Sequence, residues 1–170
     1  MFAHALPNVL LLFNNGKKQY KDYGNKVRNL DILPVFHVLL CTCFIVHIGL
    51  AFKAFLNKYS HGVMSLSILQ ITGGIILMFL ISHLIDFRFN DLENIPLDKM
   101  LTDVLKQNLK KIWYMVGIVA TGLHAFKGVS ILWLSRLDFN AREAQLLIPI
   151  GRVLVILSTC LYIIPVVLIK

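Results

Sequence analysis

The sequence predicts an all-α membrane protein with four full transmembrane helices and a partial helix at its N-terminus. Of the 170 residues, 57% are hydrophobic and only 15% are charged, whereas soluble domains carry about 25% charged residues. The apolar residues form four runs long enough to cross about 30 Å of hydrocarbon, separated by polar links. We therefore expect a single transmembrane domain over residues 1–170.

The first half of the chain contains the partial helix and two of the full spans. Residues 1–13 are apolar but too few to cross a membrane, which suggests a helix whose beginning is missing. The first full span covers 34–56 and opens with Pro34, which suits a first helical turn because the missing N–H is not needed there. The second span covers 63–85 and contains two adjacent glycines, which are common where membrane helices pack closely.

Two further spans and one surface helix are expected in the second half. The third span covers 112–133, with Trp113, Tyr114 and Trp133 at its ends as in an aromatic belt, and the fourth covers 146–169. Before the third span, residues 97–109 carry apolar residues at helical spacing, which indicates an amphipathic helix lying in the membrane interface. The net charge of +8 comes mostly from the links, where basic residues contact lipid headgroups, so nucleic-acid binding is not expected.

Histidines inside three of the apolar runs are the strongest functional signal. An ionisable group at mid-membrane is a functional-site hypothesis by default, and imidazole is the usual axial ligand of haem iron. His47 follows Pro34, and His124 follows Ile112, at nearly the same distance along the chain. Because the rise per residue of a helix is fixed, the two imidazoles are expected at nearly equal depth on neighbouring helices. This pair predicts a haem b held by two histidines.

A second histidine pair is conditional on the partial helix. His83 lies near the end of its span, and His4 would lie at a comparable depth if residues 1–13 head toward the same side. The alternative for each histidine is a hydrogen bond to a neighbouring helix, but several histidines at matched depths favour ligands. Gly49 and Gly122 stand close to histidines and are expected to leave room for a flat macrocycle.

Two basic residues within the spans need anionic or aqueous partners. Lys127 follows His124 by three positions and so shares its helix face, while Arg152 lies near the start of the last span. A buried cation requires an anion, and a haem propionate would serve. The alternative is that both side chains extend toward lipid headgroups.

The spacing and flanks of the four histidines resemble a known family. His4, His47, His83 and His124 follow one another at nearly even intervals along the chain. The pattern is similar to the cytochrome b membrane-anchor subunit of succinate dehydrogenase and fumarate reductase, in its single-chain, two-haem form. The flanking segments that fit are Leu69-Gln70, Gly74-Ile75, Asp86-Phe87-Arg88, Leu97-Asp98-Lys99-Met100-Leu101, Tyr114-Met115-Val116-Gly117 and His124-Ala125-Phe126-Lys127-Gly128.

This resemblance implies an electron-transfer subunit without catalytic residues of its own. It would anchor a flavoprotein subunit and an iron–sulfur subunit, and electrons from succinate would reach a quinone. The proximal haem would use His47 and His124, and a distal haem would use His83 and His4. Ser67 and Gln70 are the family-based candidates for the quinone site, although Ile71 stands where the family often has arginine.

The resemblance implies an energy-transducing membrane as the location of the chain. The short apolar stretch 1–13 departs from the family and leaves two alternatives: a further small membrane subunit completes the first helix, or the distal haem is lost and His4 is not a ligand. A divided or reduced subunit of this kind favours the mitochondrial inner membrane slightly over the bacterial cytoplasmic membrane.

Two other functions stay open at this point. One is a dihaem cytochrome b anchor of another quinone-linked dehydrogenase, which would use the same histidine ligands. The other is a small membrane subunit without haem, acting in assembly or transport, whose histidines relay protons or only pack. Transporters usually carry carboxylates within the membrane, and this chain has none deep in a predicted span.

Overall fold

A computed structural model of the chain is helical, and three of its helices are long and apolar enough to cross a membrane. These candidate spans are Pro34–Asn57, Asn108–Ser130 and Gln145–Leu168. They agree with the predicted class of helical membrane protein. The structure describes residues 18–19, 22–23, 26, 30–60, 67–86, 97–135 and 141–168. The predicted partial helix 1–13 lies outside these residues.

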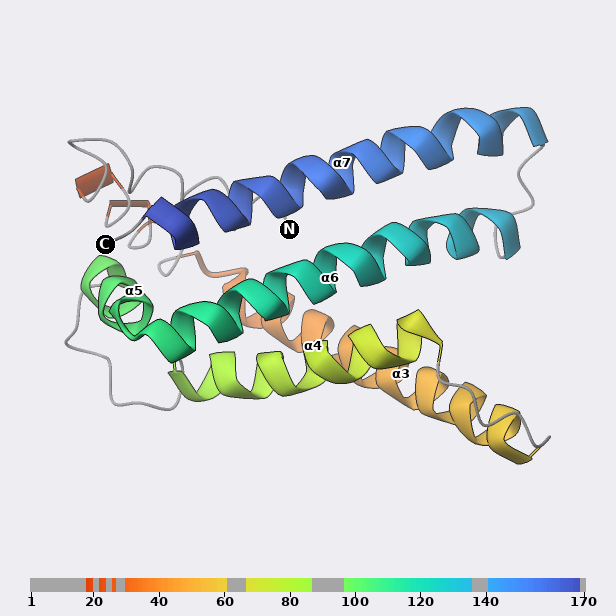
Figure 1. Cartoon of the computed structure of the whole chain (residues 1–170), viewed down its shortest axis with the longest axis horizontal. Coiled ribbons are helices and arrows are strands. Elements are labelled where there is room, and N and C mark those ends of the chain that lie inside the picture. Colours follow the sequence, from red (N-terminus) through yellow and green to blue (C-terminus); the bar gives the residue numbers. More distant parts are fainter. Residues whose placement is uncertain are drawn as a thin grey trace.

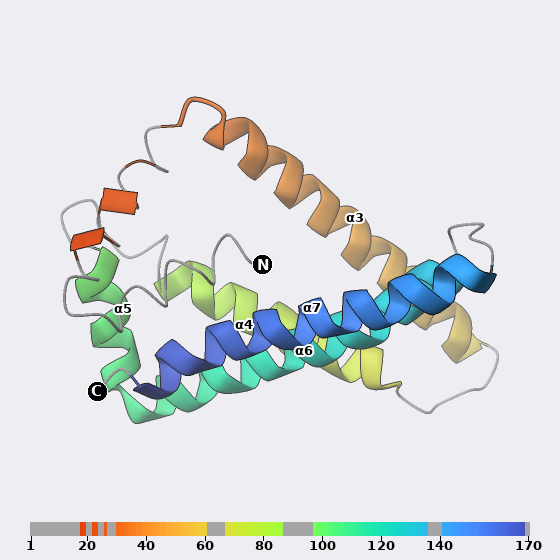
Figure 2. The ribbon, with the colours of Figure 1, turned by 90° about the horizontal axis from the view of Figure 1, so that it is seen from above.

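Helix α6 is the centre of the bundle. It covers Asn108–Ser135 and packs against α7, Ala141–Leu168, on one side and α4, Ile68–Leu84, on the other (Figure 1). Helix α3, Leu33–Ser60, runs obliquely to these three helices (Figure 2). Its apolar stretch contains no buried residue within the part of the chain that the structure describes, so nearly all of its surface is available to lipid or to a bound group.

Helix α4 is shorter than the predicted second span. It has 17 residues, whereas a full span needs about 20, so a total of four full spans remains a prediction. A capping box fixes its start: the Ser67 N–H donates to Gln70 Oε1 at 2.8 Å, and the Gln70 N–H donates to Ser67 Oγ at 3.4 Å. These two bonds satisfy N–H groups that the helix itself leaves unpaired.

Two glycines of α6 allow its neighbours to approach closely. A Cβ atom on Gly117 would collide with the Phe79 ring of α4, and one on Gly122 would lie 2.5 Å from Thr159 Oγ1 of α7. The expectation that Gly122 leaves room for a macrocycle is therefore wrong, because Thr159 fills that space. Gly49 on α3 does have open space, with no atom of another residue within 4 Å of its Cβ position among the described residues.

Helix α5, Leu97–Lys106, closes one end of the bundle (Figure 1). It ends one position before Gln107, and α6 begins directly after that residue, so the predicted 97–109 helix is divided there. Its amphipathic character is confirmed, but Val104 and Leu105 are buried together with core residues of α6 and α7 rather than facing lipid. The buried cluster comprises Val104, Leu105, Tyr114, Ile118 and Val166.

Candidate functional site

The structure brings His47 and His124 together, as the sequence predicts. His47 comes from the middle of α3 and His124 from the middle of α6. Their ring centres are 6.1 Å apart, and the two ring planes make an angle of 81°. The two residues are far apart in the sequence, so their approach results from how α3 crosses α6 (Figure 2).

Helix α4 holds one edge of the His124 ring. The Thr72 hydroxyl is 3.1 Å from His124 Nδ1, and Thr72 itself is buried, with only 5% of its surface exposed. The same hydroxyl donates to the Ile68 carbonyl at 2.7 Å. A Cβ atom on Gly73 would lie 3.5 Å from His124 Cε1, so the ring rests against a position where α4 carries no side chain.

His47 stands in different surroundings from His124. Its side chain is exposed on α3, and its ring meets the His124 ring nearly edge to face. The neighbouring Gly49 adds open space on this helix. His37, a histidine near the predicted start of the same span, is also exposed on α3. His47 is therefore accessible on α3, whereas His124 is enclosed on its α4 side.

His83 belongs to a polar cluster at the other end of the α4–α6 interface. Its Nδ1 is 3.4 Å from the Tyr114 hydroxyl, and that hydroxyl donates to Asp86 Oδ2 at 3.2 Å. Asp86 Oδ1 accepts a 2.6 Å bond from Lys110 Nζ. The Asp86 side chain is only 11% exposed, so this carboxylate is largely withdrawn from solvent. We name His83, Asp86, Lys110 and Tyr114 the polar cluster.

The sequence does not predict the polar cluster as a unit. It indicates Asp86 only within a segment that fits the family, and Tyr114 only within another such segment and in an aromatic belt. One signal is readable, because Asp86 follows His83 by three positions and therefore shares its helix face. Tyr114 follows Lys110 by four positions on the next helix, which also places both on one face. Which face of α6 meets which face of α4 cannot be read from the sequence.

Arg152 finds its partners within the protein. Its guanidinium donates to Ser130 Oγ from Nη2 at 2.6 Å and from Nε at 3.2 Å, and it lies 4.9 Å from the centre of the Phe126 ring. Contacts of this kind over an aromatic face stabilise a cation away from water. Lys127 is exposed on α6. A propionate-binding role remains a prediction for both residues, with Arg152 already oriented by α6.

The remaining predicted site residues are Ser67 and Gln70 at the start of α4, and His4. Ser67 and Gln70 bond to each other in the cap of α4, so they have a structural role, and their role toward a quinone stays a prediction. His4 lies outside the described residues. Among the described residues, no group of three or more His, Cys, Asp or Glu side chains could hold a metal ion. A haem held by two histidines needs no such group.

Comparison with known proteins identifies no relative of the chain. No protein family, curated protein or solved structure matches it. The chemistry of the site therefore rests on the residues themselves.

Proposed function

We propose that the chain is the cytochrome b membrane-anchor subunit of a succinate:quinone oxidoreductase and that His47 and His124 hold its haem. The observation that carries this proposal is the approach of two imidazoles from two different membrane helices. A histidine that only packs needs one hydrogen-bonding neighbour, whereas a metal held by two histidines requires imidazoles from two helices to come together.

The distance between the rings fits an iron atom. Bonds from an imidazole nitrogen to a transition metal are about 2 Å long, and the ring centre lies about 1 Å beyond the nitrogen, so two rings on one metal have centres about 6 Å apart. The separation of His47 and His124 is 6.1 Å.

The residues of the chain would ligate the haem iron, orient the haem and keep water away from it. A bound haem b supplies one-electron transfer, and the protein sets its position and its potential through ligands and burial. His47 and His124 would ligate the iron from α3 and α6. Arg152, held by Ser130 and Phe126, and Lys127 would meet the propionates. Ser67 and Gln70 are the proposed quinone contacts.

The proposal includes the partners that such a subunit requires. A flavoprotein subunit and an iron–sulfur subunit would deliver electrons, a quinone would accept them, and membrane lipids would cover α3. A location in an energy-transducing membrane belongs to the same proposal. A distal haem between His83 and His4 stays a prediction that depends on residues outside the described part of the chain.

Optical spectra of the native complex, reduced first with succinate and then with dithionite, test the proposed function. We expect a b-type α-band that develops with succinate and does not require dithionite. A band that develops only with dithionite would point to an anchor of another quinone-linked dehydrogenase. The complete absence of a b-type band would refute the haem proposal and leave the assembly or transport function.

A further inference from the structure

We infer that Thr72 is a positioning residue that fixes His124 as the tautomer with a proton on Nδ1 and leaves Nε2 as the nitrogen with a lone pair. The inference about the tautomer depends only on the hydrogen bonds between α4 and α6. Its meaning for metal binding rests on the proposed function, because Nε2 would then be the nitrogen that ligates iron.

The argument begins with the single proton of the Thr72 hydroxyl. The oxygen lies 2.7 Å from the Ile68 carbonyl oxygen, 3.3 Å from the Leu69 carbonyl oxygen and 3.1 Å from His124 Nδ1. A carbonyl oxygen has no proton to give, so the short contact with Ile68 requires the hydroxyl to be the donor. Having given its proton to the backbone, the hydroxyl can only accept from His124. Nδ1 therefore carries a proton.

The position of the His124 ring determines what its hydrogen bond to Thr72 does to the other ring nitrogen. Cε1 and Nδ1 of His124 lie against Gly73, so the edge with these atoms faces α4. Nε2 is on the other side of Cε1, and His47 approaches the ring from α3. A neutral histidine with a proton on Nδ1 has its lone pair on Nε2, which is the form that binds a metal. A partner on the second nitrogen also fixes the rotation of the ring and raises its basicity.

Ferric haem titration of the full chain in lipid nanodiscs tests the consequence for ligation. Thr72→Val keeps the shape of the side chain and removes the hydroxyl, whereas Thr72→Ser keeps the hydroxyl. We expect Thr72→Val to bind haem about 10–100-fold more weakly than the original chain, and Thr72→Ser to bind it equally well. Equal binding by all three proteins, each with unchanged helix content in circular dichroism, would overturn the inference.

Nitrogen-15 NMR of His124 in the haem-free full chain tests the tautomer without any substitution. We expect Nδ1 to show the shift of a protonated nitrogen and Nε2 that of an unprotonated one, and the reverse assignment would overturn the inference. This measurement also separates the two claims. If the original chain takes up no haem, the proposed function fails, while the NMR result still decides which nitrogen of His124 carries the proton, and the same spectrum of Thr72→Val decides whether Thr72 sets it.

Discussion

The same pair of helices, α4 and α6, treats two histidines in opposite ways. His83 joins the polar cluster, in which imidazole, phenol, carboxylate and ammonium groups form one continuous hydrogen-bonded chain within the protein. His124 is bonded along one edge by Thr72 and meets His47 of a third helix with its ring. His83 therefore serves to join α4 and α6, whereas His124 is also in contact with a third helix, α3.

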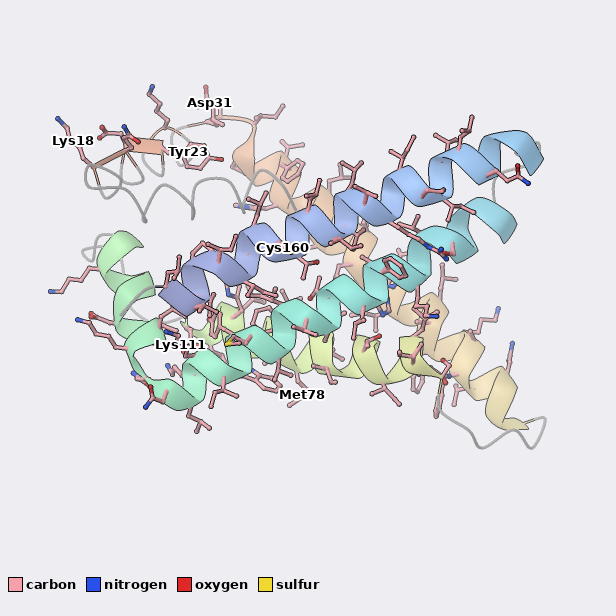
Figure 3. The ribbon with its side chains drawn as sticks, turned by 45° about the horizontal axis from the view of Figure 1, so that its top comes forward. Lys18, Tyr23, Asp31, Met78, Lys111 and Cys160 are labelled. Atoms are coloured by element: carbon pink, nitrogen blue, oxygen red, sulfur yellow. The ribbon has the colours of Figure 1, made fainter. Side chains whose placement is uncertain are left out.

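The two regions also differ in the charged groups that surround each histidine. The polar cluster contains both a carboxylate and an ammonium group. Lys111 lies at the end where α5 meets α6 (Figure 3), and its Nζ donates to the Val167 carbonyl of α7 at 3.2 Å. His124 contacts the Thr72 hydroxyl and the His47 ring, and neither of these partners is a carboxylate or an ammonium group. A charge-balanced cluster is complete without a ligand, whereas two imidazoles brought together from different helices gain most from a cation between them. The comparison therefore favours the pair as the ligand site.

The largest expected effect comes from a substitution that pushes α4 away from α6, at a contact that lies between the polar cluster and the histidine pair. Gly117→Ala would place a methyl group inside the Phe79 ring, and overpacking of this kind costs about 1–3 kcal/mol. We expect lower thermal stability and weaker haem retention together, because both regions depend on this helix contact. Gly128→Ala is the matched control on α6, since its Cβ position has no neighbour within 4 Å in the described part of the chain. Equal melting temperatures for the two variants would show that α4 does not pack as described.

The next largest effect is expected when the negative charge of Asp86 is removed from the polar cluster. Asp86→Asn leaves the Lys110 ammonium without its carboxylate, and for a pair that is partly exposed we expect a loss of about 1–2 kcal/mol. A double-mutant cycle with Lys110→Met measures the coupling in the free energy of unfolding. Haem binding should remain unchanged, because neither residue contacts the histidine pair. Additive effects of the two substitutions would contradict the ion pair.

A smaller effect distinguishes the two roles considered for His83. His83→Ala removes its bond to Tyr114, for which we expect a loss of about 1 kcal/mol in stability and full retention of the haem at the other pair. Haem content per chain, measured by the pyridine haemochrome assay, provides the test. A fall to half of the original content would instead establish a second haem that uses His83 as a ligand.

The smallest effect concerns the two cations. Lys127→Ala removes an exposed ammonium group and should weaken haem binding only a few-fold, equivalent to about 1 kcal/mol or less. Arg152→Ala should have the larger effect of the two, because Ser130 and Phe126 already hold the guanidinium in one orientation. Ferric haem titrations at low and high salt compare them. A larger loss for Lys127→Ala would reverse the assignment of the main propionate partner.

The depth of each group along its helix can be predicted from the sequence, because the rise per residue is fixed. The approach of His47 to His124 follows from that rule together with a crossing of their helices. Rotation about the helix axes and lateral packing cannot be predicted in this way. For that reason the sequence places Gly122 beside a macrocycle although it faces Thr159, and Tyr114 in an aromatic belt although it bonds to Asp86.

Local signals also differ in how much they reveal. The Ser67–Gln70 capping box is a readable pattern of two residues, and it explains why α4 begins at Ile68. The apolar positions of α5 indicate an amphipathic helix correctly, but a pattern of this kind does not say whether lipid or protein covers it. Val104 and Leu105 are covered by the bundle because α5 turns back across the ends of α6 and α7.

Haem content of histidine variants tests the central claim most directly. His47→Ala and His124→Ala each remove one of the two facing rings, while His37→Ala removes an exposed imidazole from the same helix as His47 and is the control. In reduced-minus-oxidised spectra of the purified proteins, we predict that both ligand variants lose the b-type band of the shared haem and that His37→Ala keeps it. Full haem content in either His47→Ala or His124→Ala would contradict the account.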